Sequence, residues 1–157
     1  MTNTHSQKPI RETQQASEKK WGKTVLKLGF NILPSLILKA QRRLGLNPTQ
    51  LTLFIHLTDF WWDVDRIPWP SVGLLSERTG LSPRQIQRYL KELENAGLVM
   101  RLERTAPHKG KLSNYYDLSG LVKKLQDLAP EFLEAEEVAK ETRKKVTKQR
   151  PQLKVVK

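Results

Sequence analysis

Hydrophobic positions recur at helical spacing through the middle of the chain, most clearly over residues 83–95. The apolar stripe of this segment consists of Ile86, Leu90 and Leu93, with Tyr89 at its edge. Positions spaced i, i+4 and i+7 lie on one side of a helix, so the stripe predicts a buried face. The opposite stripe is polar and consists of Arg84, Arg88, Lys91 and Asn95, flanked by Gln85 and Gln87. A helix over 83–95 would therefore expose a cationic face rich in amide groups.

The residues before this helix carry the signals of a tight turn between two helices. Gly80 suits the left-handed conformation that ends a helix, and the preceding helix is expected over 71–79. Ser82 is a favourable N-cap, Pro83 suits the first helical position, and Gln85 stands at capping-box spacing. Two helices in this order form a helix-turn-helix, whose second helix enters the major groove of DNA. For a lone helix, a solvated face without any ligand is the simpler interpretation.

Two further helices are expected on the amino-terminal side of the turn. Asn47-Pro48 opens a helix over 48–62, and its expected core face is Leu51, Phe54, Ile55, Leu57 and Trp61. A shorter helix over 36–44 is closed by a glycine. A glycine and a proline interrupt the apolar segment 25–38, so packing on the domain is favoured over a role at a membrane surface.

Alternating apolar and charged residues follow the polar-faced helix. Residues 98–103 and 114–118 are predicted to be two short strands, and the loop between them is rich in lysine, glycine and proline. Two strands joined by a basic loop directly after a helix-turn-helix form a wing. The basic residues expected at or near its tip are Arg104, His108, Lys109 and Lys111. They could meet phosphates or the minor groove, although a solvated hairpin tip would look similar.

The carboxyl-terminal third is predicted to be helical and then basic. A helix over 120–128 precedes Pro130, which is expected to break or restart it. The acidic-to-basic order from Glu131 onward suits the dipole of a helix that extends to about Lys148. Apolar positions at roughly heptad spacing fade after Phe132. They fit either a short dimer seam or packing on the domain.

Charge is unevenly distributed along the 157 residues, whose net charge is +12. Residues 1–23 carry five bases and two acids, residues 24–138 carry fifteen and thirteen, and residues 139–157 carry eight and one. Basic tails are typical of chains that bind nucleic acid, and an anionic membrane or an acidic protein would also attract them. We expect a disordered basic tail over 1–23, a domain over 24–128, and a carboxyl-terminal helix with a basic tail over 129–157.

Several kinds of chemistry are disfavoured by what the sequence lacks. There is no cysteine, so disulfides, thiolate metal sites and cysteine nucleophiles are excluded. The three histidines are scattered, and neither a glycine-rich nucleotide loop nor paired catalytic carboxylates are present, so we expect no enzyme, metal or cofactor. Without a signal peptide or an apolar run that could span a bilayer, we expect a cytoplasmic, nucleoid-associated protein with no membrane partner.

The chain resembles a bacterial winged helix-turn-helix domain over the run IPWPSVGLLSERTGLSPRQIQRYLKELENAGLVMRLER, followed by a basic loop and SNYYDLSGLV. Similar domains occur in plasmid and phage replication initiators, in the amino-terminal domains of primosomal DnaD-like proteins, and in small transcription regulators. The resemblance covers residues 47–118, or 30–128 with the flanking helices. It implies a mainly α fold with a small β-hairpin (α+β), flanked by amino- and carboxyl-terminal helices.

The resemblance also implies which residues contact DNA. Those matching the recognition helix are Ser82, Arg84, Gln85 and Arg88, with Gln87 beside them and Lys91 on the same stripe. Those matching the wing are Arg104, Lys109 and Lys111, while Ser71 matches the phosphate-binding start of the supporting helix. Arginine pairs with guanine and glutamine with adenine. Because Glu92 and Glu94 interrupt the basic face, only the first two turns are expected to enter the groove.

The function expected is a sequence-specific regulator of transcription that binds double-stranded DNA and blocks or recruits polymerase. Such modules usually bind as pairs on repeated half-sites, so a homodimer is among the expected assemblies. One alternative is a plasmid or phage replication or partition initiator that binds origin repeats and recruits a replication protein. The other is an interaction adaptor that uses a winged-helix scaffold to bind protein.

Overall fold

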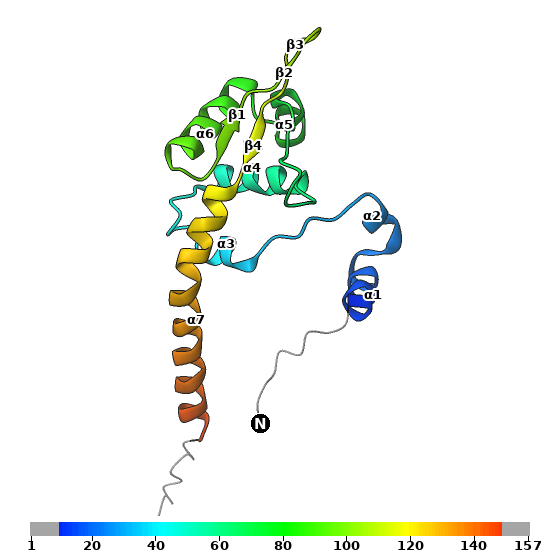
Figure 1. The fold of residues 1–157 in the computed structure, drawn as a ribbon. Coiled ribbons are helices and arrows are strands. Elements are labelled where there is room, and N and C mark those ends of the chain that lie inside the picture. Colours follow the sequence, from blue (N-terminus) through cyan, green and yellow to red (C-terminus); the bar gives the residue numbers. More distant parts are fainter. Residues whose placement is uncertain (1–9, 149–157) are drawn as a thin grey trace, which may run out of the picture. The chain divides into compact units, whose positions relative to one another are not determined.

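The computed structural model describes residues 10–148, with side chains from residue 14 onward, and the chain forms two units that divide between Ile32 and Leu33. The first unit contains α1 (Ile10–Trp21) and α2 (Lys23–Lys27). The second is mainly helical with a short hairpin, which confirms the expected fold class (Figure 1). Its elements are α3 (Ser35–Lys39), α4 (Pro48–Asp59), α5 (Val72–Thr79), α6 (Pro83–Asn95), β1 (Met100–Leu102), β2 (Thr105–Ala106), β3 (Gly110–Lys111), β4 (Tyr115–Asp117) and α7 (Ser119–Lys148).

The first unit is helical where disorder was predicted. The disordered tail expected over 1–23 is wrong for residues 10–21, which form α1. Most of these residues are glutamine, glutamate, lysine, arginine or alanine, and their backbone preference favours a helix even without a core to pack on. Residues 1–9 lie outside the described part of the chain. The two units divide after Ile32, later than the boundary expected at residue 23.

The apolar residues of 25–38 behave in two ways. Leu28 and Ile32 are exposed, so the prediction that the whole segment packs on a domain is wrong for them. Ile37, on α3, is fully buried and belongs to the core of the second unit. The division between the two units lies between these two groups.

Two helices are shorter than predicted. The helix expected over 36–44 stops at Lys39, and hydrogen-bonded turns continue from there to Gly45. The helix expected to reach Trp62 stops at Asp59. Both ends are tightened by backbone hydrogen bonds from residue i to i−3, which commonly satisfy the free carbonyl groups at the end of a helix.

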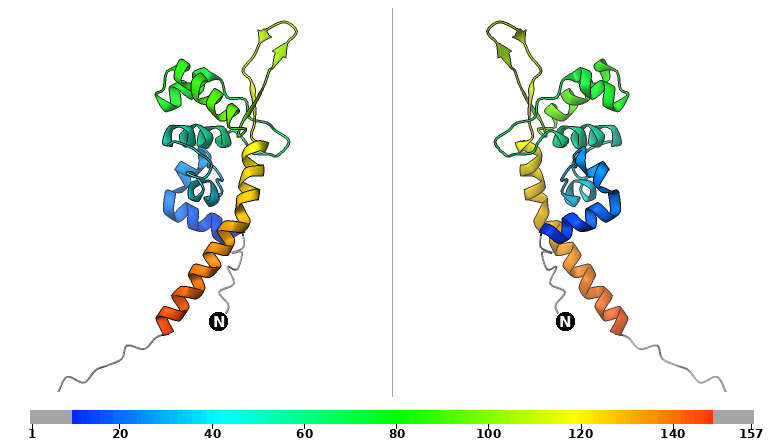
Figure 2. Two further views of the ribbon diagram at one scale, coloured as in Figure 1. Left: turned by 90° about the vertical axis from the view of Figure 1, so that its left-hand side faces the viewer. Right: turned by 90° about the vertical axis from the view of Figure 1, so that its right-hand side faces the viewer.

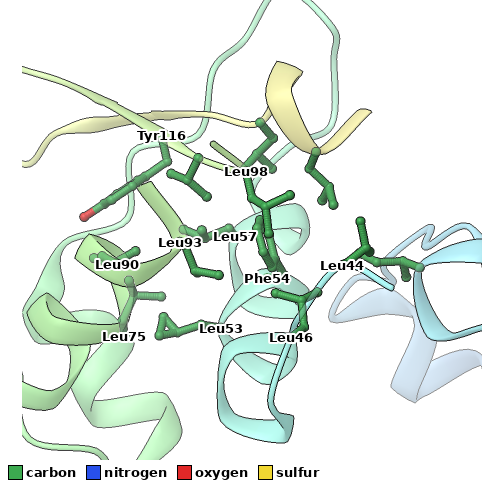
Figure 3. Packing of buried hydrophobic residues seen from close by; sticks show 14 of the residues in the cluster. Leu44, Leu46, Leu53, Phe54, Leu57, Leu75, Leu90, Leu93, Leu98 and Tyr116 are labelled. Atoms are coloured by element: carbon green, nitrogen blue, oxygen red, sulfur yellow. The ribbon is translucent and has the colours of Figure 1, made fainter. Parts of the chain in front are cut away.

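One core fills the second unit, between the inner faces of its helices and β4 (Figure 3). The three positions predicted for α6 are all buried: Ile86, Leu90 and Leu93, which confirms the apolar stripe. On α4 the buried apolar residues are Leu53, Phe54 and Leu57, whereas Ile55 is exposed. The predicted core face of α4 was therefore wrong at Ile55, since a residue two positions from Leu53 and Leu57 lies on the far side of the helix.

The wing is a hairpin held by two short ladders. β1 pairs antiparallel with β4, placing Arg101 opposite Tyr116, and β2 pairs antiparallel with β3, placing Ala106 opposite Gly110. Its strands are shorter than predicted because the pairing is divided into these two parts. The Tyr116 N–H donates to the Pro68 carbonyl at 2.8 Å. The segment that leads into α5 therefore runs beside β4 and joins the wing to the helix-turn-helix.

α7 is one continuous helix of 30 residues, so the prediction that Pro130 breaks it is wrong. Tertiary contacts hold the helix on both sides of the proline. Leu128 and Phe132 pack against the core, and an Arg43 nitrogen lies 2.8 Å from a Glu131 oxygen. The heptad positions thus pack on the domain as far as Phe132. Within the second unit, α7 extends away from the wing (Figure 2), and no helix among residues 10–148 is long and apolar enough to cross a bilayer.

The start of α7 approaches the backbone after α6 very closely. A Cβ atom added at Gly120 would lie 2.2 Å from the Gly97 carbonyl oxygen. The Leu121 N–H also donates to the Leu98 carbonyl at 3.2 Å. Only glycine fits this position without displacing one of the two segments.

We predict that Gly120→Ala lowers the free energy of unfolding by about 1–3 kcal/mol, because the new methyl group must push α7 away from the Gly97 carbonyl. Urea denaturation followed by circular dichroism measures the change. Gly73→Ala is the matched control. Its new Cβ would meet nothing nearer than the Ser71 Oγ at 3.8 Å, so the control should be neutral or stabilising by up to about 1 kcal/mol. Equal stability of the two variants would contradict the close approach.

Candidate nucleic-acid interface

The start of α6 is fixed by two reciprocal hydrogen bonds. The Ser82 Oγ accepts from the Gln85 N–H at 3.2 Å, and the Gln85 Oε1 accepts from the Ser82 N–H at 2.9 Å. This is the predicted capping box, and caps of this kind contribute about 1 kcal/mol. Gln85 was also expected to contact DNA, where glutamine pairs with adenine. One lone pair of its oxygen is engaged in the cap, and the other lone pair and the amide NH₂ group remain for a ligand.

The turn before α6 is also well determined. Gly80 ends α5 in the left-handed conformation, with φ at 72°, and the Ser76 Oγ donates to the Leu81 carbonyl at 2.6 Å. Ser71 caps α5, because its Oγ accepts from the Leu74 N–H at 3.0 Å. The hydroxyl hydrogen of Ser71 is not used by that bond and can be donated to a phosphate.

The outer face of α6 carries three exposed cations. Among the described residues, the Arg84 guanidinium has no hydrogen bond or ion pair. The Arg88 Nε lies 3.8 Å from a Glu92 oxygen, and the Lys91 Nζ lies 3.5 Å from a Glu94 oxygen. Exposed pairs one helical turn apart contribute only about 0.5 kcal/mol. A phosphate or a guanine can therefore compete for Arg88 and Lys91 at little cost.

Arg101 on β1 joins the wing to α6. One guanidinium nitrogen donates to the Gln87 Oε1 at 3.0 Å, and the other donates to a Glu94 oxygen at 2.8 Å. The Arg101 N–H also donates to Glu94, at 3.3 Å. The bond from the Arg101 side chain holds the pKa of the Glu94 carboxyl below its usual value, although partial burial acts in the opposite direction. The amide of Gln87, predicted as a groove residue, is therefore oriented by Arg101 before any ligand arrives.

Glu92 is attached to α4. The Gln50 Nε2 donates to a Glu92 oxygen at 2.8 Å, while the Gln50 Oε1 accepts from the Asn47 N–H at 3.0 Å. Gln50 is buried, so its side chain both caps α4 and holds the far end of α6. The two carboxylates expected to interrupt the basic face are therefore both bound within the domain.

The wing places its predicted cations in three different environments. Lys109 is in the exposed turn between β2 and β3, as expected. Lys111 is on β3, and its Nζ lies 3.0 Å from a Glu103 oxygen. Arg104 lies between the two ladders of the wing, and its side chain is directed onto aromatic residues. Its guanidinium lies 5.1 Å from the Trp69 ring centre and 4.7 Å from the Tyr115 ring centre, so it stacks on aromatic rings that brace the hairpin.

Two residues of this surface were missed by sequence reasoning. Arg101 was expected only as a charged position in an alternating strand, and no contact with another helix was predicted for Gln50. Their partners, Gln87, Glu94 and Glu92, lie on another element, and no local spacing indicates such pairs. Within residues 10–148, no cluster of three or more acidic or histidine side chains could hold a metal ion.

We predict that Glu94→Gln destabilises the protein by about 1 kcal/mol at pH 7, where the carboxylate is charged and bound to Arg101. The folded-state pKa of Glu94 is lowered, so this stability is present above the unfolded-state pKa. It is lost as the pH falls through the folded-state pKa. Urea unfolding of parent and variant should therefore converge in acid. A difference that is equal at neutral and acidic pH would contradict the ion pair. Glu134→Gln, at an exposed position of α7, is the control and should leave stability unchanged.

Comparison with known proteins supports the architecture. Residues 44–99 match a helix-turn-helix domain family. The crystal structure of the N-terminal domain of DnaD protein from Geobacillus kaustophilus is similar, with a TM-score of 0.52 and 22% identity over 79% of this chain and 96% of that chain. The crystal structure of a MarR/EmrR family transcriptional regulator from an Acinetobacter species gives a TM-score of 0.39 and 15% identity over 89% and 99% of the two chains. No curated protein matches the chain.

The likeness to the DnaD domain bears on the fold alone, given its low identity. The family match covers α4, α5 and α6 and ends just before β1. The hairpin that follows is the wing. It is joined to the segment before α5 by the hydrogen bond from the Tyr116 N–H on β4. The chain therefore has a winged helix-turn-helix fold, with a helix-turn-helix domain over residues 44–99.

Proposed function

We propose that this protein binds double-stranded DNA sequence-specifically and regulates transcription at the sites it occupies. The observation that carries the proposal is the division of α6 into two faces. Its apolar stripe is completely buried, while Arg84, Arg88 and Lys91 on the other face are exposed. A helix of this width fits the major groove, and guanidinium groups at its first turns can reach base edges.

The wing supports the same orientation. Lys109 at its exposed turn is expected to meet the phosphate backbone beside the groove that α6 would enter, and Ser71 can donate to a phosphate from the start of α5. Such contacts position the protein without reading sequence. Arg104 stacks on Trp69 and Tyr115 and so stiffens the wing, and it is expected to contribute less to phosphate binding than Lys109.

The basic end of α7 adds a second cationic surface. Lys140, Arg143 and Lys144 are exposed there. At a rise of about 1.5 Å per residue, the helix carries them roughly 30 Å from its start beside the wing. They are expected to attract DNA phosphates outside the groove contacted by α6, which raises affinity without adding sequence preference. A homodimer is also part of the proposal, because modules of this kind usually bind as pairs on repeated half-sites.

We predict that Arg88→Ala weakens binding to the preferred duplex by about 1–3 kcal/mol and reduces the preference for that sequence over random DNA. Lys109→Ala should instead weaken preferred and random duplexes equally, because a phosphate contact carries no sequence information. Fluorescence anisotropy at several salt concentrations measures both effects, and the slope against salt should fall for Lys109→Ala.

Arg42→Ala is the matched control for these variants. It removes the same charge from an exposed position in the turns after α3, so binding should change little. If Arg88→Ala behaved like this control, α6 would not be in the groove. Loss of all binding on removal of Arg42 would place the interface elsewhere on the domain.

Selection of bound genomic fragments by the purified protein separates regulation from replication. Sites scattered upstream of several genes are expected for a transcription regulator. A single cluster of direct repeats would favour a replication or partition initiator instead. Binding without any recoverable site would favour the adaptor role, in which the winged helix contacts protein.

A further inference from the structure

We propose that residues 19–32 bind the surface of an anionic lipid bilayer, with their apolar side chains in the interface and their lysines among the headgroups. This basic apolar segment lies in the first unit of the chain, whereas the proposed DNA-binding helix lies in the second. The two surfaces are therefore independent of each other. Exposed apolar side chains, positive charge and a closed backbone turn all favour this ligand.

Large apolar side chains are exposed close together along the basic apolar segment. Leu28 is 92% exposed and Ile32 is 80% exposed, while Trp21 and Val25 are each more than half exposed. Scattered apolar residues are normal on a protein surface, whereas a dense group of them marks a site that binds protein or membrane. The second unit was expected to cover this segment, and the exposure of Leu28 and Ile32 shows that it does not.

Helix α2 separates apolar from basic side chains. Val25 stands three positions before Leu28, the C-cap residue, whose backbone is still right-handed helical. Lys23 and Lys27 stand four positions apart on the same turn. At about 100° per residue, the two pairs lie on opposite sides. An apolar face backed by a lysine-rich face is the arrangement of helices that lie in the plane of a bilayer interface.

Trp21, the last residue of α1, adds an aromatic anchor. The Lys20 Nζ lies 4.9 Å from the centre of the Trp21 ring. Indole rings are enriched where a membrane meets water, and a lysine can cover apolar surface with its stem while its ammonium group stays in water. Trp21 and Lys20 are therefore suited to the level of the headgroups.

The charge of the basic apolar segment favours an anionic surface. Its four lysines are all exposed, and the sequence has no acidic residue from 19 to 58. Glu18 precedes the segment, and one of its oxygens lies 3.9 Å from the Lys23 Nζ. The Lys23 side chain is 79% exposed, so this ion pair is weak. Anionic headgroups would supply the negative charge that the segment itself lacks.

The backbone of the turn forms its own hydrogen bonds. The Leu28 N–H donates to the Val25 carbonyl at 3.1 Å, and the Gly29 N–H donates to the Leu26 carbonyl at 3.1 Å. An unpaired backbone group is costly to move away from water. Because these groups are paired, the apolar face can enter the interface without that cost.

Two other ligands match the basic apolar segment less well. DNA phosphates would pair with its lysines but would leave Leu28 and Ile32 in water. The same segment of a second copy would cover the apolar side chains but would bring like charges together. No membrane partner was expected from the sequence, because a signal peptide and a spanning run are missing. Binding at the surface of a bilayer requires neither of them.

Co-sedimentation of the full chain with lipid vesicles tests the proposal. Vesicles that contain phosphatidylglycerol should bind the protein at least about tenfold more tightly than pure phosphatidylcholine vesicles. Leu28→Ser should weaken binding to the anionic vesicles about tenfold, because an apolar side chain no longer enters the interface. Leu133→Ser is the matched control. It removes a leucine that is 62% exposed on α7, and it should bind like the parent.

Equal binding of the parent and Leu28→Ser would show that cations elsewhere in the chain hold the vesicles, and it would overturn the proposal. Circular dichroism should show the same helix content in both proteins, because the Leu28 side chain is almost fully exposed. The same vesicles made with brominated lipid should quench tryptophan fluorescence. Trp21→Phe should remove that quenching. Quenching that persists in this variant would place another part of the chain at the lipid and would also overturn the proposal.

DNA binding separates this proposal from the proposed function. Leu28→Ser should bind the preferred duplex as tightly as the parent does. Intact DNA binding without vesicle binding would overturn the bilayer proposal alone, and vesicle binding without DNA binding would overturn only the proposed function. Sedimentation equilibrium without lipid tests a second copy as the ligand. An oligomer that Leu28→Ser dissociates, in a protein that does not bind vesicles, would assign the apolar face to self-association and overturn the proposal.

Discussion

The burial of three aliphatic side chains, Ile86, Leu90 and Leu93, holds the proposed recognition helix in place. All three are inaccessible to solvent and pack in the core shared with Leu53 and Leu75 (Figure 3). Burying a side chain of this size contributes about 1.5–3 kcal/mol. Every other interaction at the edge of α6 is weaker than any one of these, so the core sets the position of the helix. The ion pairs on its outer face are free to be exchanged for DNA.

Polar contacts then decide what that fixed helix can offer. Arg101 from the wing and Gln50 from α4 bind the glutamates of α6 and the oxygen of Gln87. Each contact adds little to stability, but together they orient the Gln87 amide and engage both carboxylates of α6. The wing and α6 are coupled through Arg101, which contacts Gln87 and Glu94.

The sequence predicted the parts of the fold that local rules control. The capping box at Ser82, the left-handed Gly80 and the apolar stripe of α6 were all confirmed, since each depends on residues within two turns of one another. The path of α7 through Pro130 was mispredicted, because it depends on contacts with distant residues such as Arg43, in the turns after α3. Helix α1 was not predicted, although the backbone preference of its own residues favours a helix without any long-range contact.

The position of the candidate site could be predicted from the sequence, but the hydrogen-bond partners of its side chains could not. Spacing placed Arg84, Arg88 and Lys91 on one face, whereas the partners of Gln87 and Arg104 come from segments distant in the chain. The sequence does not show whether the oxygen of a glutamine accepts a hydrogen bond from a distant residue. Only the folded structure shows such long-range hydrogen bonds.

Nitrogen-15 NMR of the side-chain groups during titration with duplex DNA tests the central claim most directly. The resonances of the Arg84 and Arg88 guanidinium groups and of the Gln87 amide should shift together during the titration. They should reach saturation at the same ratio of DNA to protein, in salt high enough to suppress non-specific binding. The Gln50 amide, buried behind α6, should stay unchanged. Shifts confined to the basic end of α7, with the α6 side chains unaffected, would contradict the account.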